Sequence, residues 1–307
     1  DDSFKNITIE ELVAFFQHPS KYLLQQRLGV YLQDDSVLDQ DQESFKLDKL
    51  EEYQMGQQLL ERFLEKQSLE SYQQIAEAKN LLPDGWPGQK VMNNQVNEVQ
   101  RFGSFIKSNF DQEELETQPI DFSINGFHLG GRLNDIYEKE QLFYRFGRKR
   151  PKDLVALWIR HVCFQMIKPD DHPGYSRLIT LENNNDIRFS VLSPVMEAEE
   201  ILENLLNLYW SGMKKNLIFF PETSYTFARE IIWKGKSEDE AVKYAKKKWL
   251  SNYRPYYCEG NDPYNKYLIK DGNPLENKEL YDILKNLSIR FWKPFFEVFS
   301  DEKGGAL

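Results

Sequence analysis

Residues 131–164 read GRLNDIYEKEQLFYRFGRKRPKDLVALWIRHVCF, and this stretch decides the fold class. Within it, Leu142–Phe146 is a short apolar and aromatic run bounded by polar residues, a pattern typical of a β-strand. From Asp153 to Ile167 the apolar side chains recur instead at helical spacing, as Leu154 and Trp158 do. A strand followed closely by an apolar helix predicts an α/β fold.

Further strands are predicted on both sides of this stretch. Upstream, the β-prone runs at 122–124 and 127–133 are separated by Asn125-Gly126, a pair typical of a two-residue hairpin turn. Gly130-Gly131 predicts another break in the same region. Downstream, a second hairpin is predicted, with strands at 177–181 and 186–192 and a polar turn at Asn183–Asn185. The sequence therefore predicts a meander of hairpins.

Helical patterns dominate the rest of the chain. Thr8 and Glu11 have the spacing of a capping box, which predicts a helix start, and Pro19 suits the first turn of the next helix. Further helices are predicted at 48–66, 69–80, 91–106 and over much of 194–299, with an acidic connection at 33–52. We expect one unit over 1–307, with a helical part at about 1–115 and a sheet-containing core with C-terminal helices at about 116–307.

Composition and charge narrow the class of protein. The 307 residues have a mean hydropathy of -0.65 and no apolar run long enough to cross a bilayer. The two cysteines, Cys163 and Cys258, favour a reducing, cytoplasmic setting over a disulfide framework. The net charge of -10 divides into -13 over residues 1–140 and +3 over 141–307, so the second half is better suited to meet a polyanion. Because position 1 is Asp and no leader pattern precedes the first helix, we expect a fragment of a longer protein.

Common catalytic motifs are not completed in this sequence. Gly235-Lys236-Ser237 resembles the end of a P-loop, but Glu230 stands where the leading glycine belongs, so Ser237 is predicted to cap a helix instead. The four histidines share no metal-ligand spacing. A metal-dependent nuclease needs an acidic residue with Lys two positions later. That spacing occurs outside the expected sheet, on predicted solvated helices or a tail, at Glu77–Lys79, Glu276–Lys278 and Asp301–Lys303.

Several segments together resemble the C-terminal domain of RecC, the gamma subunit of exodeoxyribonuclease V. The segments are 11–32 (ELVAFFQHPSKYLLQQRLGVYL), 47–60 (LDKLEEYQMGQQLL), 81–88 (LLPDGWPG) and 131–164. The resemblance implies a PD-(D/E)xK nuclease-like core, a mixed sheet flanked by helices, without the working active site. It also implies a scaffold and DNA-strand guide in a helicase–nuclease that processes DNA double-strand ends for recombinational repair. RecB-like and RecD-like partners in a heterotrimer would then supply the Mg²⁺ and ATP sites, with no cofactor, metal or membrane contact expected for this chain.

The resemblance also locates a vestigial active site. Active relatives carry a strand pattern that aligns with Gly131–Tyr137 and places Asn134 at the metal-binding Asp. Their next strand aligns with Phe143–Gly147, so that Phe143 replaces the second carboxylate and Arg145 replaces the lysine. The following helix of active relatives carries a Gln and a Tyr, which align with Leu154 and Trp158. Loss of both carboxylates removes most of the attraction for Mg²⁺, so no hydrolysis is expected.

With the vestigial site inert, the basic run after the predicted strand becomes the candidate for DNA binding, since guanidinium groups bind phosphate without metal. The candidates are Arg145, Arg148, Lys149, Arg150 and Lys152. The hairpin at 176–192 is a candidate strand-separating element. Two alternatives stay open: an active Mg²⁺-dependent exonuclease with migrated ligands at Asp121, Asp135 and Glu138, and a protein-interaction module that never touches DNA.

Overall fold

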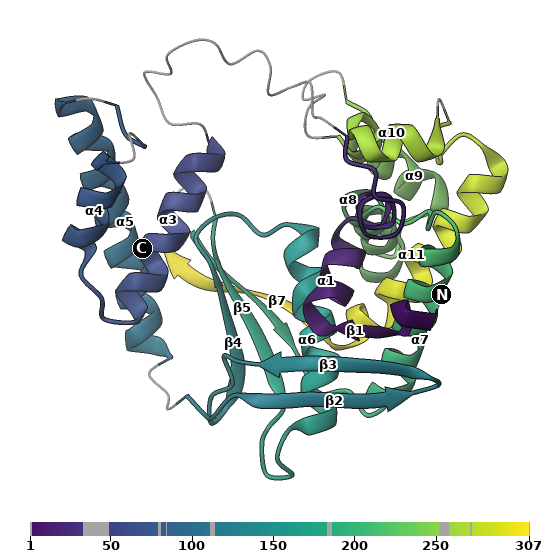
Figure 1. Ribbon diagram of the computed structural model, residues 1–307, viewed down its shortest axis with the longest axis horizontal. Helices are drawn as coiled ribbons and strands as arrows, with labels where there is room; N and C mark the ends of the chain where they lie inside the picture. Colours follow the sequence, from purple (N-terminus) through teal and green to yellow (C-terminus); the bar gives the residue numbers. More distant parts are fainter. Residues whose placement is uncertain are drawn as a thin grey trace.

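The computed structural model describes residues 2–32, 49–78, 81–83, 85–110, 114–182, 186–251, 258–270 and 272–306. These residues form an α/β fold with two sheets flanked by helices and a mostly helical N-terminal part (Figure 1). The predicted fold class is confirmed at this level.

The smaller sheet contains three strands in the order β1-β3-β2, with bounds β1 Asn6–Thr8, β2 Gln118–Ile124 and β3 Phe127–Leu133. β2 and β3 form the predicted hairpin, and both turn residues have positive φ, 47° at Asn125 and 80° at Gly126, as a twisted hairpin turn requires. The predicted break at Gly130-Gly131 is wrong, because β3 runs through both glycines. The short β1 was not predicted; it pairs with β3 in parallel.

The larger sheet contains four strands in the order β4-β5-β6-β7. The bounds are β4 Glu140–Arg145, β5 Tyr175–Leu181, β6 Asp186–Leu192 and β7 Phe299–Ala306. The second predicted hairpin, β5 with β6, is confirmed, while its turn at Asn183–Asn185 lies outside the described residues. Both of its strands are internal, flanked by β4 and β7. The predicted meander ends at β3, because β4 belongs to the other sheet, where it pairs with β5 in parallel.

The last strand corrects a second expectation. Asp301–Lys303 was predicted to be part of a tail, but it lies in β7, which pairs antiparallel with β6 from Phe299 opposite Leu192 to Ala306 opposite Asp186. The segment is charged and rich in glycine, so its own sequence does not indicate a strand. Backbone pairing with β6 and the anchoring of Phe299 in the core give it its conformation.

The helices divide between the two faces of the larger sheet. In Figure 1, α3 (Lys49–Leu64), α4 (Leu69–Ala78) and α5 (Trp86–Asn109) stand on one side of β4–β7. They form a separate apolar cluster with Ile179 and Ile187 of that sheet and with Phe146, which follows β4. The predicted helices at 48–66 and 69–80 are confirmed over the described residues, and Lys79 of the Glu77–Lys79 spacing lies outside them.

The remaining helices build the main core around α6 (Pro151–Ile167). They are α1 Ile9–Gln17, α2 Pro19–Tyr22, α7 Ala198–Lys214, α8 Pro221–Ala228, α9 Glu238–Trp249, α10 Pro263–Ile269 and α11 Lys278–Val298. Short helices of the 3-10 type are η1 Asp2–Lys5 and η7 Glu259–Asn261, and short π-helices are η2 Leu23–Arg27 and η5 Arg229–Trp233. The predicted capping box of Thr8 and Glu11 and the Ser237 cap are both present. Over the described ranges, no helix is both long enough and apolar enough to traverse a bilayer.

The close approach of β3 to α1 generates a stability prediction. Gly131 has φ +144°, and a Cβ there would lie 2.9 Å from Ile9 Cγ2. Gly131→Ala should therefore lower the free energy of unfolding by about 1–3 kcal/mol, measured by chemical denaturation. Gly130→Ala is the matched control, because its Cβ would meet nothing closer than 3.8 Å. Equal losses in the two variants would contradict this packing.

Candidate functional site

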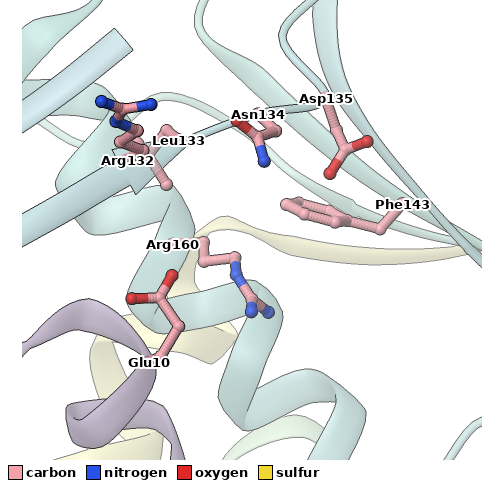
Figure 2. Close-up of a pocket in the computed structure, with 7 residues that line it drawn as sticks. All are labelled: Glu10, Arg132, Leu133, Asn134, Asp135, Phe143 and Arg160. Carbon is pink, nitrogen blue, oxygen red and sulfur yellow. The ribbon is translucent and has the colours of Figure 1, made fainter. Parts of the chain in front are cut away.

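A pocket of about 210 Å³ lies where β3 ends and β4 begins, with α1 and α6 closing it from the opposite side. In Figure 2 the lining side chains surround one space, except that the guanidinium of Arg132 points away from it. The lining residues are Glu10, Arg132, Leu133, Asn134, Asp135, Phe143 and Arg160. The pocket therefore contains both acidic and basic groups beside an aromatic ring.

The turn between β3 and β4 positions two of these residues. Asp135 has φ +60°, a left-handed conformation that a short polar residue tolerates better than most. Its carbonyl accepts a hydrogen bond from the Leu142 backbone N–H at 2.9 Å, and Ile136 forms an isolated bridge with Gln141. These bonds tie the turn to β4 and hold Asn134 and Asp135 at the pocket wall.

Two of the three predicted vestigial positions line this pocket. Asn134 is exposed, and its Oδ1 accepts a hydrogen bond from the Thr117 hydroxyl at 3.0 Å. Phe143, on β4, presents its ring to the same space. An amide and a phenyl ring thus occupy the places where the sequence alignment expects metal-binding carboxylates in active relatives.

Two arginines complete the wall, and neither was predicted as a site residue. The Arg160 guanidinium of α6 lies 5.8 Å from the centroid of the Phe143 ring. Among the described residues, neither Arg160 nor Arg132 has a carboxylate oxygen within 4.0 Å of its nitrogens. The helical pattern of 153–167 could indicate that residue 160 lies on the same helix as Trp158, but only the fold shows that it faces β4.

The two pocket carboxylates belong to Glu10 and Asp135. Burial raises the pKa of Asp135 to about 6, and the negative charge of Glu114 adds to this, while Arg160 opposes it. Within the described residues, no group of three or more His, Cys, Asp or Glu side chains is arranged to hold a metal ion.

The other proposed migrated ligands lie outside the pocket. Asp121, on β2, is largely exposed and lies 3.4 Å from His128 Nδ1. Glu138 is exposed in the β3–β4 connection and does not line the pocket. The structure therefore brings Asp135 together with Glu10, and not with Asp121 and Glu138.

Arg145, the third vestigial position and a DNA-binding candidate, is 9% exposed and lies away from the pocket. Its Nη1 is 3.1 Å from Asp153 Oδ1 and donates to the Tyr53 hydroxyl at 2.8 Å. Its guanidinium also lies 4.3 Å from the centroid of the Tyr53 ring. These contacts join β4 to α6 and α3, so the side chain is engaged inside the protein.

The remaining basic candidates are divided by their surroundings. Lys149 is tied to β6 and β7, where its Nζ contacts Ser190 Oγ at 3.0 Å and Asp301 Oδ1 at 2.7 Å. Arg148 and Arg150 are exposed, and Lys152 is half-buried at the start of α6. Three basic side chains, at 148, 150 and 152, thus lie at or near the surface, within seven residues of the buried Arg145.

Leu154 and Trp158, aligned with a catalytic helix motif, are both fully buried. They belong to the main core and do not line the pocket. Their side chains therefore stabilise the packing of α6 in this structure.

The comparisons with a family profile and with known proteins agree on one family. A family profile described as the RecC C-terminal domain matches residues 4–232. The RecBCD enzyme subunit RecC of Escherichia coli K12 is 25% identical over 302 residues, covering 95% of this chain and 26% of that protein. The same subunit of Haemophilus influenzae is 23% identical over 214 residues, covering 66% of this chain and 18% of that protein. The chain thus spans about a quarter or less of the length of these relatives.

The raised pKa of Asp135 makes the stability of the protein depend on pH. The folded state holds a proton up to about pH 6, whereas the unfolded group loses it near 3.8, so stability falls as pH rises through this window. Asp135→Asn should remove this fall, which amounts to about 1–3 kcal/mol between pH 4 and 7. Denaturant unfolding of both proteins across this range measures the difference. The same pH dependence in the variant would show that Asp135 is not the titrating group.

Proposed function

This chain belongs to the RecC C-terminal domain family, and we propose that it is a non-catalytic, nuclease-like domain of a RecC subunit. In this proposal it acts as a subunit scaffold and DNA-strand guide within a helicase–nuclease that processes DNA double-strand ends for recombinational repair. RecB-like and RecD-like subunits would be its partners, and the Mg²⁺ and ATP sites would belong to them.

One observation carries the proposal that the domain is inert. The pocket at the predicted vestigial site offers an amide at Asn134 and a ring at Phe143, with the Arg160 guanidinium near the ring. Mg²⁺ prefers several oxygen ligands in octahedral geometry, and nearby positive charge opposes its binding. These residues support the proposal that the pocket does not hold a catalytic magnesium ion, since Glu10 and Asp135 are the only carboxylates among its described lining residues.

The strand-guide part of the proposal rests on the segment between β4 and α6. Arg148 and Arg150 are exposed there, and Lys152 follows on the first turn of α6. Arg145 and Lys149 anchor the same segment through Asp153 and Asp301. A basic segment held rigidly at both of these points can present its exposed guanidinium groups to a phosphate backbone at low entropic cost.

Metal titration tests the inert character of the domain. With labelled single- and double-stranded DNA, the chain should give no cleavage products at any Mg²⁺ or Mn²⁺ concentration. The pocket has two carboxylates, Glu10 and Asp135, and the described residues contain no group of three or more His, Cys, Asp or Glu placed to hold a metal ion. A gel assay with a chelator control measures this. Metal-dependent cleavage that disappears in Asp135→Asn would instead support the active exonuclease.

Removal of two positive charges tests whether the segment between β4 and α6 binds a DNA strand. Arg148→Ala combined with Arg150→Ala should weaken binding of a single-stranded oligonucleotide and reduce the slope of log affinity against log salt by roughly 1.4, as expected for two lost phosphate contacts. Fluorescence anisotropy at several salt concentrations measures both quantities. Arg101→Ala combined with Lys293→Ala removes the same charge from exposed positions on α5 and α11 and is the matched control. An unchanged slope, or no binding by the unmodified chain, would favour a protein-interaction module.

A further inference from the structure

The Arg160 side chain has a fixed place but no anionic partner at ion-pair distance among the described residues. Its guanidinium lies 5.8 Å from the Phe143 ring centroid, a contact that orients it without neutralising its charge. Other arginines in the same fold are paired: Arg145 with Asp153, Arg177 with Glu140 and Arg229 with Glu230. Arg160 therefore presents a partly desolvated positive charge to the pocket.

The Asn134 side chain adds a neutral donor to the same space. The Thr117 hydroxyl donates to Oδ1 of Asn134 at 3.0 Å, which turns the Nδ2 amide away from Thr117. An amide N–H donates hydrogen bonds, whereas an ionised carboxylate at the same position would only accept them. The pocket wall is thus suited to an anion at the point where a metal site needs negative oxygens.

The carboxylates of Glu10 and Asp135 also line this pocket and act against a bound anion. Glu10 and Asp135 formally balance Arg132 and Arg160 when all four are charged. Burial raises the pKa of Asp135 to about 6, so that part of its negative charge is lost in mildly acidic solution.

We propose that this pocket binds a phosphate group of a DNA strand without metal, through the Arg160 guanidinium and the Asn134 amide. The inference rests on the proposed function, because it names what the inert site holds. At about 210 Å³ the pocket is smaller than the ~300–1,000 Å³ of drug-sized ligand sites, so it admits one phosphate with part of its nucleotide and excludes a duplex. The phosphate is either a strand terminus or an internal phosphodiester, and both share this chemistry.

The test uses the full 307-residue chain in the presence of a chelator, titrated with the 5′-phosphorylated dinucleotide pdTpdT and with unphosphorylated TpT, and followed by ¹⁵N chemical shifts. Asn134→Asp is nearly isosteric, removes the donor and adds a negative charge. It should weaken binding of the phosphate by roughly tenfold or more. Asn94→Asp, at an exposed position of α5, makes the same charge change elsewhere and should leave binding within about twofold.

A second variant tests whether weaker binding by Asn134→Asp comes from a lost phosphate contact rather than from a change in the β3–β4 turn. Arg160→Gln keeps a polar side chain, although a shorter one, removes the charge and should also weaken binding by roughly tenfold. Stronger binding of pdTpdT than of TpT would assign the site to a strand terminus, and equal binding would assign it to an internal phosphodiester.

Two results would overturn the phosphate site. One is the absence of saturable binding of either dinucleotide, and the other is equal binding by the unmodified chain, Asn134→Asp and Arg160→Gln. Neither result bears on the exposed Arg148 and Arg150, which longer oligonucleotides test separately. Failure of the pocket and failure of the strand guide are therefore distinguishable.

Discussion

The parallel pairing of β4 with β5 is the constraint on which the rest of the structure depends. Parallel neighbours cannot be joined by a tight turn, so the chain must cross over from the end of β4 to the start of β5. Here α6 makes the crossover, and it is buried from Leu154 to Phe164 on nearly every side. Helices α1, α7 and α8 pack on it, and the main core forms around them. A helix so enclosed has little freedom, and every residue that it contributes to a site is held firmly.

The pocket follows from this arrangement. Because α6 lies against the sheet, its Arg160 is brought over the Phe143 ring of β4, while α1 brings Glu10 to the same place. The left-handed turn at Asp135 then directs the end of β3 toward them. Arg145 lies two residues beyond Phe143 on the strand, yet it meets Asp153 at the first turn of α6 and Tyr53 of α3. One strand therefore contributes Phe143 to the pocket and, away from the pocket, Arg145 to internal contacts that join β4 to α6 and α3.

Local patterns in the sequence were sufficient for the features whose causes are local. The Asn125-Gly126 turn, the Thr8–Glu11 capping box and the apolar spacing of α6 each depend on residues within a few positions of one another. The short β1 and the charged β7 could not be predicted in this way, since each becomes a strand only by pairing with a segment more than a hundred residues away. Resemblance to a family located Asn134 and Phe143, whereas Glu10 and Arg160 reach the pocket only through tertiary packing. The burial of Arg145 has the same origin, because its partner Tyr53 comes from a distant helix.

The size of the Coulomb energies indicates why a pocket with this arginine would favour an anion over a metal ion. Two unit charges at 4 Å interact by about 4 kcal/mol at an effective dielectric constant near 20, so a guanidinium at that distance would oppose a divalent cation by ~8 kcal/mol. The carboxylates that could offset this repulsion are Glu10 and Asp135, and burial disfavours the charged form of Asp135. For a phosphate oxygen the sign reverses, and the same guanidinium becomes attractive by about 4 kcal/mol before desolvation is subtracted. An arginine held over Phe143 by a buried helix thus opposes a divalent cation at this site and, in the proposal above, attracts a phosphate oxygen.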